Sequence, residues 1–188
     1  IAVCGRTEAT LQRTLKDLIG KGVKAVYVVG DVSDLQNLDG LHHEVVDRLG
    51  PVDILVNNVG GSIARASVDG TSLDDFQKTF DLNLHSSYRL MQLVTPHMKQ
   101  RKWGRIINIA SIWGREYGGN IGYMSAKAAL IAATKHSAVD LAKYGILVNS
   151  IAPGSISHHE GSWETFQRDN SEDVVEEFIK SNLPLGRF

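Results

Sequence analysis

The feature that most constrains the fold is a regular alternation of short apolar runs with longer amphipathic segments. This alternation is typical of parallel strands joined by crossover helices. The predicted strands are Ile1–Cys4, Ala25–Val29, Ile54–Val56, Arg105–Ile109 and Leu147–Ile151. Because these runs carry apolar residues on both faces, we expect a doubly wound parallel sheet of the α/β class, buried under helices on both faces.

The segments between the runs carry helix start and stop signals. The predicted helices are Thr7–Gly20, Leu38–Leu49, Leu73–Gln100 and Ser125–Lys143. Pro96 is expected to kink or end the third helix. Beyond Pro153 the pattern predicts an irregular loop over Gly154–Asn170 and a last helix at Glu172–Ser181. We interpret residues 1–188 as one incomplete domain in which residues 154–182 form a substrate loop and lid helix.

Composition excludes several classes of protein. The 188 residues are 43% hydrophobic, which suits one globular domain, and the net charge of -1 gives no electrostatic footprint for nucleic acid or anionic lipid. No apolar run is long enough to span a bilayer, and the first residues do not have the pattern of a signal peptide. The single cysteine, Cys4, excludes an internal disulfide. These features favour a soluble, cytoplasmic protein.

Two residues at the start of the Ala-rich helix are the strongest candidates for chemistry. Tyr123 and Lys127 stand four apart, so they project from one helix face, and Ser111 follows the strand Arg105–Ile109 at its ligand-facing end. Alone, such a Tyr and Lys pair is usually a surface aromatic and a solvated lysine. Together with Ser111, the pair predicts proton transfer to or from a substrate oxygen, because a nearby cation favours the phenolate of a tyrosine whose pKa is otherwise about 10.

Further motifs accompany these residues in a fixed order along the chain, namely Asn57-Asn58-Val59-Gly60, Asn83, Ser111, Tyr123 with Lys127, and Pro153-Gly154. Over essentially the whole chain this order resembles the short-chain dehydrogenases/reductases, and the overall look is similar to 3-oxoacyl-carrier-protein reductases. The resemblance implies a Rossmann-type fold. It also implies an oxidoreductase that transfers a hydride between NADP(H) or NAD(H) and a carbonyl or secondary alcohol.

The resemblance implies a role for each catalytic candidate. Ser111 orients the substrate oxygen, and Tyr123 is the general acid or base. Lys127 lowers the pKa of Tyr123 and holds the cofactor ribose, and Asn83 supports a water that extends the proton relay. A sugar or steroid substrate would suit the same residues, so the substrate stays open.

Cofactor contacts are implied at both ends of the domain. Besides Tyr123 and Lys127, the implied contacts are Asp31 and Val32 at the adenine, Asn57, Val59 and Gly60 beside the ribose, and Pro153, Gly154 and Ile156 at the nicotinamide carboxamide. Val59 replaces the commoner alanine, and His158 stands where a threonine is commonly expected. Two structural alternatives stay open, a strand-ending turn at Asn57–Gly60 and a helix cap at Asp31 or Asp34.

The preference between the two cofactors follows from the end of the first predicted strand. NAD enzymes place an acid there for the ribose 2′-hydroxyl, whereas NADP enzymes favour arginine for the 2′-phosphate. Gly5 occupies the place of the acid, and Arg6 follows it. The sequence therefore favours NADP over NAD, and the alternative is that Arg6 only caps a sheet edge.

The resemblance further implies that the chain is truncated at both ends. Related proteins begin with a strand and a Gly-rich turn that binds the pyrophosphate, a unit of roughly 30 residues. We expect this unit to be missing before Ile1 and a strand to be missing after Phe188. The chain would then bind dinucleotide weakly and expose a sheet edge. A non-catalytic binding or assembly module is therefore the main alternative, and a lyase or epimerase sharing Tyr123 and Lys127 is another.

Three further expectations concern the surroundings of the site. No metal site is expected, because the adjacent residues of His158-His159-Glu160 rarely converge on one ion. Aromatic and imidazole side chains are expected to line the substrate pocket, namely Trp113, Tyr117, His158, Trp163 and Phe166. The helices Leu73–Gln100 and Ser125–Lys143 carry apolar residues such as Leu90 on more than one face, which predicts a homodimer or homotetramer unless the chain itself covers both faces.

Overall fold

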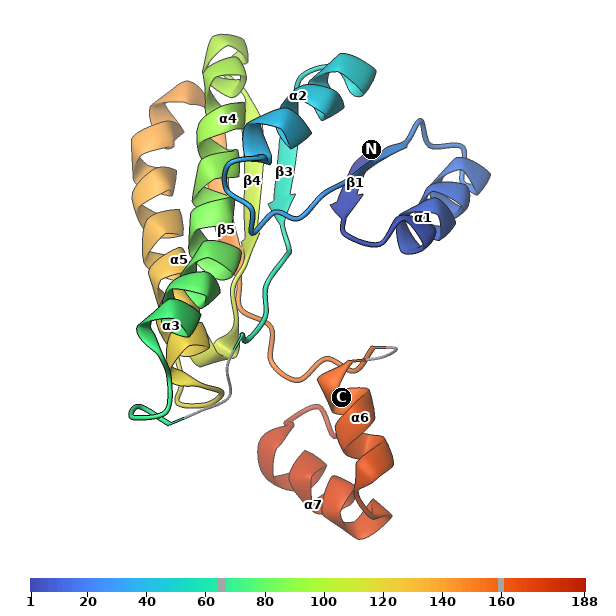
Figure 1. The fold of residues 1–188 in the computed structure, drawn as a ribbon, viewed down its shortest axis with the longest axis vertical. Helices are drawn as coiled ribbons and strands as arrows, with labels where there is room; N and C mark the ends of the chain where they lie inside the picture. The colour runs from blue at the N-terminus through green and yellow to red at the C-terminus, as the bar shows by residue number, and fades with distance from the viewer. Residues whose placement is uncertain (64–66, 159–160) are drawn as a thin grey trace. The chain divides into compact units, whose positions relative to one another are not determined.

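Every apolar run predicted as a strand is a strand in the computed structural model, which describes residues 1–63, 67–158 and 161–188. The strands are β1 (Ala2–Gly5), β2 (Val26–Val29), β3 (Ile54–Asn57), β4 (Gly104–Ile109) and β5 (Ile146–Ile151). All the pairings are parallel, as the alternation predicted, and helices flank the strands on both sides (Figure 1). The predicted α/β class and Rossmann-type architecture are therefore confirmed.

The described strands form two sheets rather than one. β1 pairs with β2, and β3, β4 and β5 pair in that order. Between the facing strands β1 and β3 lies a cavity of about 770 Å³, lined by β1, by β3 and by side chains of the neighbouring helices such as Leu41 and Leu90. The backbone edges of β1 and β3 that face this cavity are not joined to each other. The predicted free sheet edge is thus found on both strands.

The helices of residues 1–152 lie between the strands in sequence. They are α1 (Glu8–Gly20), α2 (Leu38–Leu49), α3 (Leu73–Phe80), α4 (Ser86–Arg101) and α5 (Ile121–Leu141). A π-helical turn, Asp81–His85, separates α3 from α4. Pro96 does not end the helix as predicted, since α4 continues to Arg101. Pro96 is exposed and has no backbone N–H, so the carbonyl four residues earlier lacks its helical partner. Water can hydrogen-bond to that carbonyl instead.

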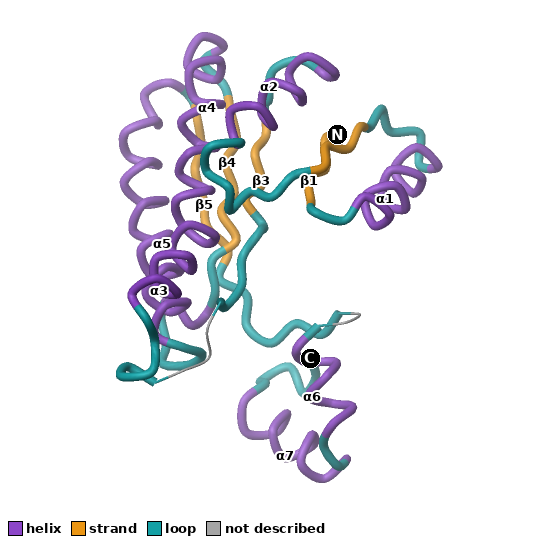
Figure 2. Tube along the Cα trace, in the orientation of Figure 1, coloured by secondary structure: helices purple, strands orange, loops and turns teal. Residues whose placement is uncertain are grey.

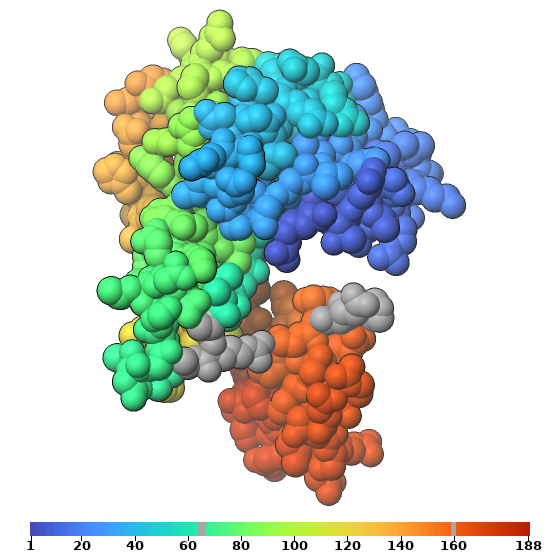
Figure 3. All heavy atoms as spheres, in the orientation of Figure 1, coloured from blue at the N-terminus to red at the C-terminus, as the bar shows by residue number. Residues whose placement is uncertain are grey.

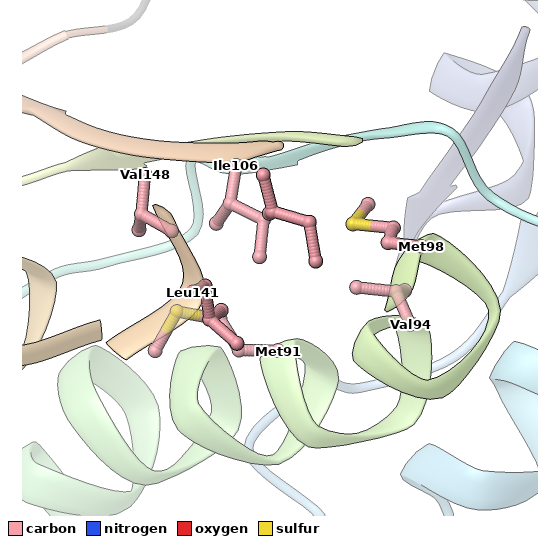
Figure 4. Packing of buried hydrophobic residues seen from close by; sticks show 7 residues of the cluster. Met91, Val94, Met98, Ile106, Leu141 and Val148 are labelled. Carbon is pink, nitrogen blue, oxygen red and sulfur yellow. The ribbon is translucent and has the colours of Figure 1, made fainter. Parts of the chain in front are cut away.

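The core lies between α4, the end of α5 and the β3–β5 sheet, and α4 and α5 run along the same face of that sheet (Figures 2 and 4). Its buried members are Met91, Val94, Met98, Ile106, Leu141, Ile146 and Val148. The opposite face is less covered than the sequence predicted, because alternate strand residues are about half exposed, among them Ile54 at 56%, Leu147 at 49% and Ile151 at 53%. The prediction of strands buried on both faces was therefore wrong for β3 and β5.

Helix α2 packs on α4, and the atoms of the two helices meet on the face shown in Figure 3. A bidentate ion pair joins them, because Arg89 Nε donates to Asp39 Oδ1 at 2.9 Å and Arg89 Nη2 to Asp39 Oδ2 at 2.6 Å. Helix α1 packs on β1 and β2. Each sheet therefore carries its own helices, and the link between α2 and α4 holds the two sheets in one unit.

Residues 153–188 form a second compact unit with helices α6 (Ser162–Asp169) and α7 (Glu172–Asn182). The prediction of the last helix is confirmed, but Ser162–Asp169 was predicted to be loop. It is helical because its aromatic side chains pack within the unit, in a ring cluster of Trp163, Phe166, Phe178 and Phe188. In the described part of the chain, no helix is long and apolar enough to cross a membrane.

Candidate active site

The turn that carries Ser111 sits directly on helix α5. β4 ends at Ile109, and the Ser111 hydroxyl oxygen accepts a hydrogen bond from the Trp113 N–H at 3.2 Å as a short 3₁₀ turn begins. At Gly114 a side chain is excluded, since a Cβ there would lie 2.8 Å from the carbonyl carbon of Lys127. The missing side chain at Gly114 therefore lets the Ser111 turn approach the helix that carries Tyr123 and Lys127.

Helix α5 starts four residues earlier than the sequence predicted. Asn120 caps it, because its Oδ1 accepts a hydrogen bond from the Tyr123 N–H at 2.9 Å. Tyr123 therefore lies in the first helical turn, where its position is fixed by the cap. Asn120 was not among the predicted site residues, although an asparagine three residues before the first turn's tyrosine is a recognisable capping signal.

Burial raises the pKa of the Tyr123 phenol, and a hydrogen bond with Ser111 partly offsets this effect. The prediction that Lys127 lowers this pKa is not met here. The ammonium lies 5.6 Å from the centre of the Tyr123 ring, over its face, and the loss of solvent around the phenol outweighs other influences. The Tyr123 phenol is consequently neutral at pH 7.

Lys127 is nearly inaccessible, with 2% of its surface exposed. Its ammonium donates to the Ile109 carbonyl at 2.8 Å, which ties α5 to the end of β4. Burial lowers the pKa of Lys127 to about 8. A lysine with this pKa loses its charge within the range where enzymes are commonly assayed, so its charge state is sensitive to pH.

Asn83 lies in the π-helical turn and is fully buried. Its amide nitrogen donates to the carbonyls of Gly61 and Thr79, each at 2.8 Å, and its oxygen accepts from the Gly61 N–H at 3.0 Å. The sequence alone suggested an amide inside a regular helix, where most face solvent. Single π-helical turns occur frequently at functional sites, and this one aims the Asn83 side chain at the segment that follows β3.

Gly60 brings that segment against both Lys127 and Asn83. A Cβ at Gly60 would lie 2.7 Å from Lys127 Nζ and 2.8 Å from Asn83 Oδ1. Val59, one residue earlier, is 42% exposed. The segment therefore combines close packing behind Gly60 with an accessible surface at Val59.

A buried amide network supports the ends of β3 and β4. Asn57 Nδ2 donates to Asn108 Oδ1 at 2.8 Å, and Asn108 Nδ2 donates to Thr134 Oγ1 at 2.9 Å. Asn57 Oδ1 is buried without a hydrogen-bond partner among the described residues. Asn57 therefore joins β3 to β4 through its side chain, in addition to ending the strand. Asn108 was not predicted, although it interrupts an otherwise apolar strand.

The proposed adenine edge lies at the ends of β1 and β2. Arg6 is 79% exposed, and its guanidinium lies 3.8 Å from the Asp31 carboxylate. The pKa of Asp31 is lowered, chiefly by hydrogen bonds from Ser33 and secondarily by Arg6. Asp31 does not cap α2, whose preceding residue is Asn37, and Val32 is buried. The side chains of Arg6 and Asp31 therefore lie accessible to solvent where β1 and β2 end.

Several predicted site residues belong to the second unit. Pro153, Gly154 and Ile156 lie there, and their contacts with the nicotinamide stay a prediction. Trp163 and Phe166 pack within that unit, as described above, and Tyr117 of the first unit is 97% exposed. His159 and Glu160 lie outside the described residues. Within the described ranges no group of His, Cys, Asp or Glu could hold a metal ion.

Comparisons with known proteins agree with this geometry. The family model for short chain dehydrogenases matches residues 1–169. A (2S)-[(R)-hydroxy(phenyl)methyl]succinyl-CoA dehydrogenase subunit of Thauera aromatica is 33% identical over 177 residues, covering 94% of this chain and 68% of that protein. The chain spans between 55% and 74% of the lengths of several curated relatives that it matches.

Solved structures of NAD- and NADPH-bound enzymes superpose closely on the chain. NAD⁺-bound xylitol dehydrogenase has a TM-score of 0.87 at 31% identity, covering 100% of this chain and 76% of that one. L-Sorbose reductase from Gluconobacter frateurii, complexed with NADPH and L-sorbose, has a TM-score of 0.89 at 27% identity, covering 100% and 74%. Proteins of this shape therefore use either nicotinamide cofactor.

Proposed function

This chain belongs to the short-chain dehydrogenase family, and from that premise we propose that it transfers a hydride between NADP(H) or NAD(H) and a carbonyl or secondary alcohol. The observation that carries the proposal is the convergence of three side chains. Tyr123 hydrogen-bonds with Ser111, and the ammonium of Lys127 lies over the same phenol ring. Proton transfer to a substrate oxygen requires this combination of a donor, an orienting hydroxyl and a nearby charge.

In the direction of reduction, Ser111 donates a hydrogen bond to the carbonyl oxygen and Tyr123 donates the proton. The raised pKa of Tyr123 suits this direction, because the phenol is protonated at neutral pH and can act as the acid. The hydroxyl groups of Ser111 and Tyr123 stabilise the negative charge that develops on the substrate oxygen. In the reverse direction Tyr123 accepts the proton as a phenolate, so oxidation is favoured at higher pH.

Lys127 acts on the phenolate once it forms. Its ammonium lies 5.6 Å from the ring centre in a buried site, where charge interactions are stronger than in water. We assign it the ribose contact as well, as the resemblance implies, with the Gly60 backbone packed closely against its ammonium. Asn83 holds the Gly61 backbone in place beside it. The relay water that the resemblance implies at Asn83 is part of this proposal.

The described residues fit a nicotinamide dinucleotide at two places. The segment that follows β3 packs against Lys127 at Gly60 and presents an accessible surface at Val59, and Arg6 offers an exposed guanidinium at the end of β1. Asp31, Val32 and Val59 complete the proposed contacts to the adenosine. The bound cofactor supplies the hydride. We propose NADP(H) over NAD(H), because the Arg6 guanidinium can pair with a 2′-phosphate. Its ion pair with the Asp31 carboxylate is long, at 3.8 Å, and leaves the guanidinium free to do so.

One observation favours a second candidate function. The cavity between β1 and β3 leaves backbone groups of both strands facing an open space of about 770 Å³. A chain in this state could serve as a non-catalytic binding or assembly module. Titration with NADPH and NADH separates the two candidates, because the module requires no cofactor binding whereas the oxidoreductase does.

The decisive experiment is Tyr123→Phe in the full-length protein, assayed with NADPH and NADH on a panel of sugar, steroid and acyl carbonyls. We expect turnover to fall by roughly 10² to 10⁴ with cofactor affinity changed only a few-fold, since only the transferable proton is lost. Tyr144→Phe is the matched control, because Tyr144 follows the far end of α5 and packs against the core. If Tyr123→Phe keeps more than about half of the activity, the assignment is wrong.

We also propose a homodimer or homotetramer that buries exposed apolar residues of α4 and α5. Tyr88 of α4 is 49% exposed and Val139 of α5 is 68% exposed. Leu90, which the sequence suggested for this surface, instead lines the cavity beside β1 and β3.

The free thiol of Cys4 fits the reducing cytoplasm, which we propose as the location.

A further inference from the structure

Trp113 contacts both partners of the proposed proton-transfer pair. Its backbone N–H donates to the Ser111 hydroxyl oxygen at 3.2 Å. Its indole meets the Tyr123 ring nearly at right angles, with 6.2 Å between ring centres and 84° between planes. An edge-to-face contact of this kind is attractive and has a preferred geometry. One residue therefore touches the orienting hydroxyl through its backbone and the proton donor through its side chain.

The indole is itself held by two glycines of the loop that leads to α5. A Cβ at Gly118 would collide with the indole nitrogen of Trp113, and one at Gly119 would lie 2.7 Å from its Cε3. Gly119 also has a φ of +71°, a left-handed conformation that favours glycine. The loop backbone thus lies flat against the indole. A side chain at either glycine would displace the ring.

The loop then passes directly into the cap of helix α5. Asn120 follows Gly119 and accepts the Tyr123 N–H at 2.9 Å. The chain from Ser111 to Tyr123 therefore forms a closed arrangement, in which the indole fills the space between the turn, the glycines and the tyrosine ring. This arrangement fixes both the backbone of Tyr123, through the cap, and its ring, through the indole.

We propose that Trp113, clasped by Gly118 and Gly119, is a positioning residue that holds the Tyr123 ring in the orientation needed to reach Ser111 and the substrate oxygen. The proposal rests on the proposed function, because it assigns the orientation of that function's proton donor. The cap fixes only the backbone of Tyr123, and the phenol still rotates about its side-chain bonds. Removing the indole opens other rotamers to the phenol, and small misplacements of a reacting group strongly reduce rates.

The kinetic test compares Trp113→Ala, Trp113→Phe and the loop control Glu116→Ala, since Glu116 is exposed in the same loop. We expect Trp113→Ala to lower kcat by about 10-fold or more, with the KM for the cofactor changed less than about three-fold. Trp113→Phe should recover most of the loss, because a phenyl edge can replace the indole edge. Glu116→Ala should match the parent. An equal loss in Trp113→Ala and Glu116→Ala, or an unchanged kcat in Trp113→Ala, overturns the proposal.

A second variant leaves the indole in place but moves it. Gly118→Ala introduces a methyl group against the indole nitrogen, so we expect it to reproduce the kcat loss of Trp113→Ala. Gly20→Ala is the matched control, because a Cβ at Gly20 meets no atom within 4 Å. Parent-like kcat in a folded Gly118→Ala variant contradicts the proposed clasp.

A structural readout separates this proposal from the proposed function. In protein labelled with ¹³C-tyrosine, the Tyr123 signals are assigned by Tyr123→Phe and compared in Trp113→Ala and Glu116→Ala. We expect shifted signals and faster ring flips only in Trp113→Ala. If no substrate is turned over by the parent protein, the proposed function fails while this comparison still decides the role of Trp113. Unchanged Tyr123 signals in Trp113→Ala refute it.

Discussion

Replacing Lys127 by methionine is expected to stabilise the fold although it removes a proposed catalytic group. Lys127 is 2% exposed, and its pKa falls from 10.5 to about 8 because burial disfavours the charged form. At pH 7 the folded protein therefore carries a buried ammonium whose main described contact is the Ile109 carbonyl at 2.8 Å. Methionine has a similar length and no charge to desolvate.

The size of the effect follows from the pKa shift. Lowering the pKa from 10.5 to about 8 corresponds to roughly 3 kcal/mol by which the fold disfavours the charged lysine. Losing the hydrogen bond to Ile109 offsets about 1 kcal/mol. We therefore expect the free energy of unfolding of Lys127→Met to exceed that of the parent by about 2 kcal/mol at neutral pH.

The dependence on pH has a definite sign. The folded-state pKa of Lys127 is lowered, so between about pH 8 and pH 10.5 the unfolded chain binds more protons than the folded one. The stability of the parent consequently rises with pH in this window, and below about pH 8 the full cost of the buried charge is present. The advantage of the methionine variant should therefore shrink by roughly 2 kcal/mol between about pH 7 and about pH 9.5.

Urea unfolding of the parent and of Lys127→Met at both pH values measures the difference directly. Subtracting the two proteins removes the contributions of other groups that titrate in the same range. Lys135→Met is the matched control, because Lys135 is exposed on the same helix. A methionine variant that is less stable than the parent at pH 7, or an advantage that does not change with pH, would refute the reasoning.

The remaining predictions concern the cofactor and assembly. Arg6→Ala should weaken NADPH binding by about 10-fold and leave NADH binding nearly unchanged, since only NADPH carries the 2′-phosphate, and fluorescence titration with both cofactors measures this. Equal losses would remove Arg6 from cofactor selection. Val139→Glu should convert the assembly to monomers in analytical ultracentrifugation, whereas Leu90→Glu should not, because Leu90 faces the cavity. A monomeric parent protein would contradict the proposed association.

The strands and the catalytic candidates were predictable because their signals are local. Each strand was a short apolar run, and its predicted ends differ from the observed ones by no more than one residue. Tyr123 and Lys127 were proposed from helical spacing and Ser111 from its place after β4, and the order of further motifs along the chain supported all three. These patterns are read from the sequence itself, so no knowledge of distant contacts was needed to propose them.

The remaining features depended on contacts between distant residues. The inward position of the Asn83 side chain depends on its hydrogen bonds to Gly61, 22 residues away. The pKa direction of Tyr123 depends on burial by the folded chain, which helical spacing does not reveal. Helix α6 depends on ring packing with Phe178, so its polar, irregular sequence suggested a loop. The split into two sheets likewise arises from pairing rather than from any single segment.

The division between the β1–β2 sheet and the β3–β5 sheet also partitions the proposed work of the protein. Arg6 and Asp31, which would select the cofactor, belong to the smaller sheet, whereas Ser111, Tyr123 and Lys127 belong to the larger sheet and its helix. Among the described residues, no strand pairing joins the two sheets. Affinity for the adenosine end and speed of proton transfer are therefore free to vary separately through substitution, with side-chain contacts between α2 and α4 as their mechanical connection.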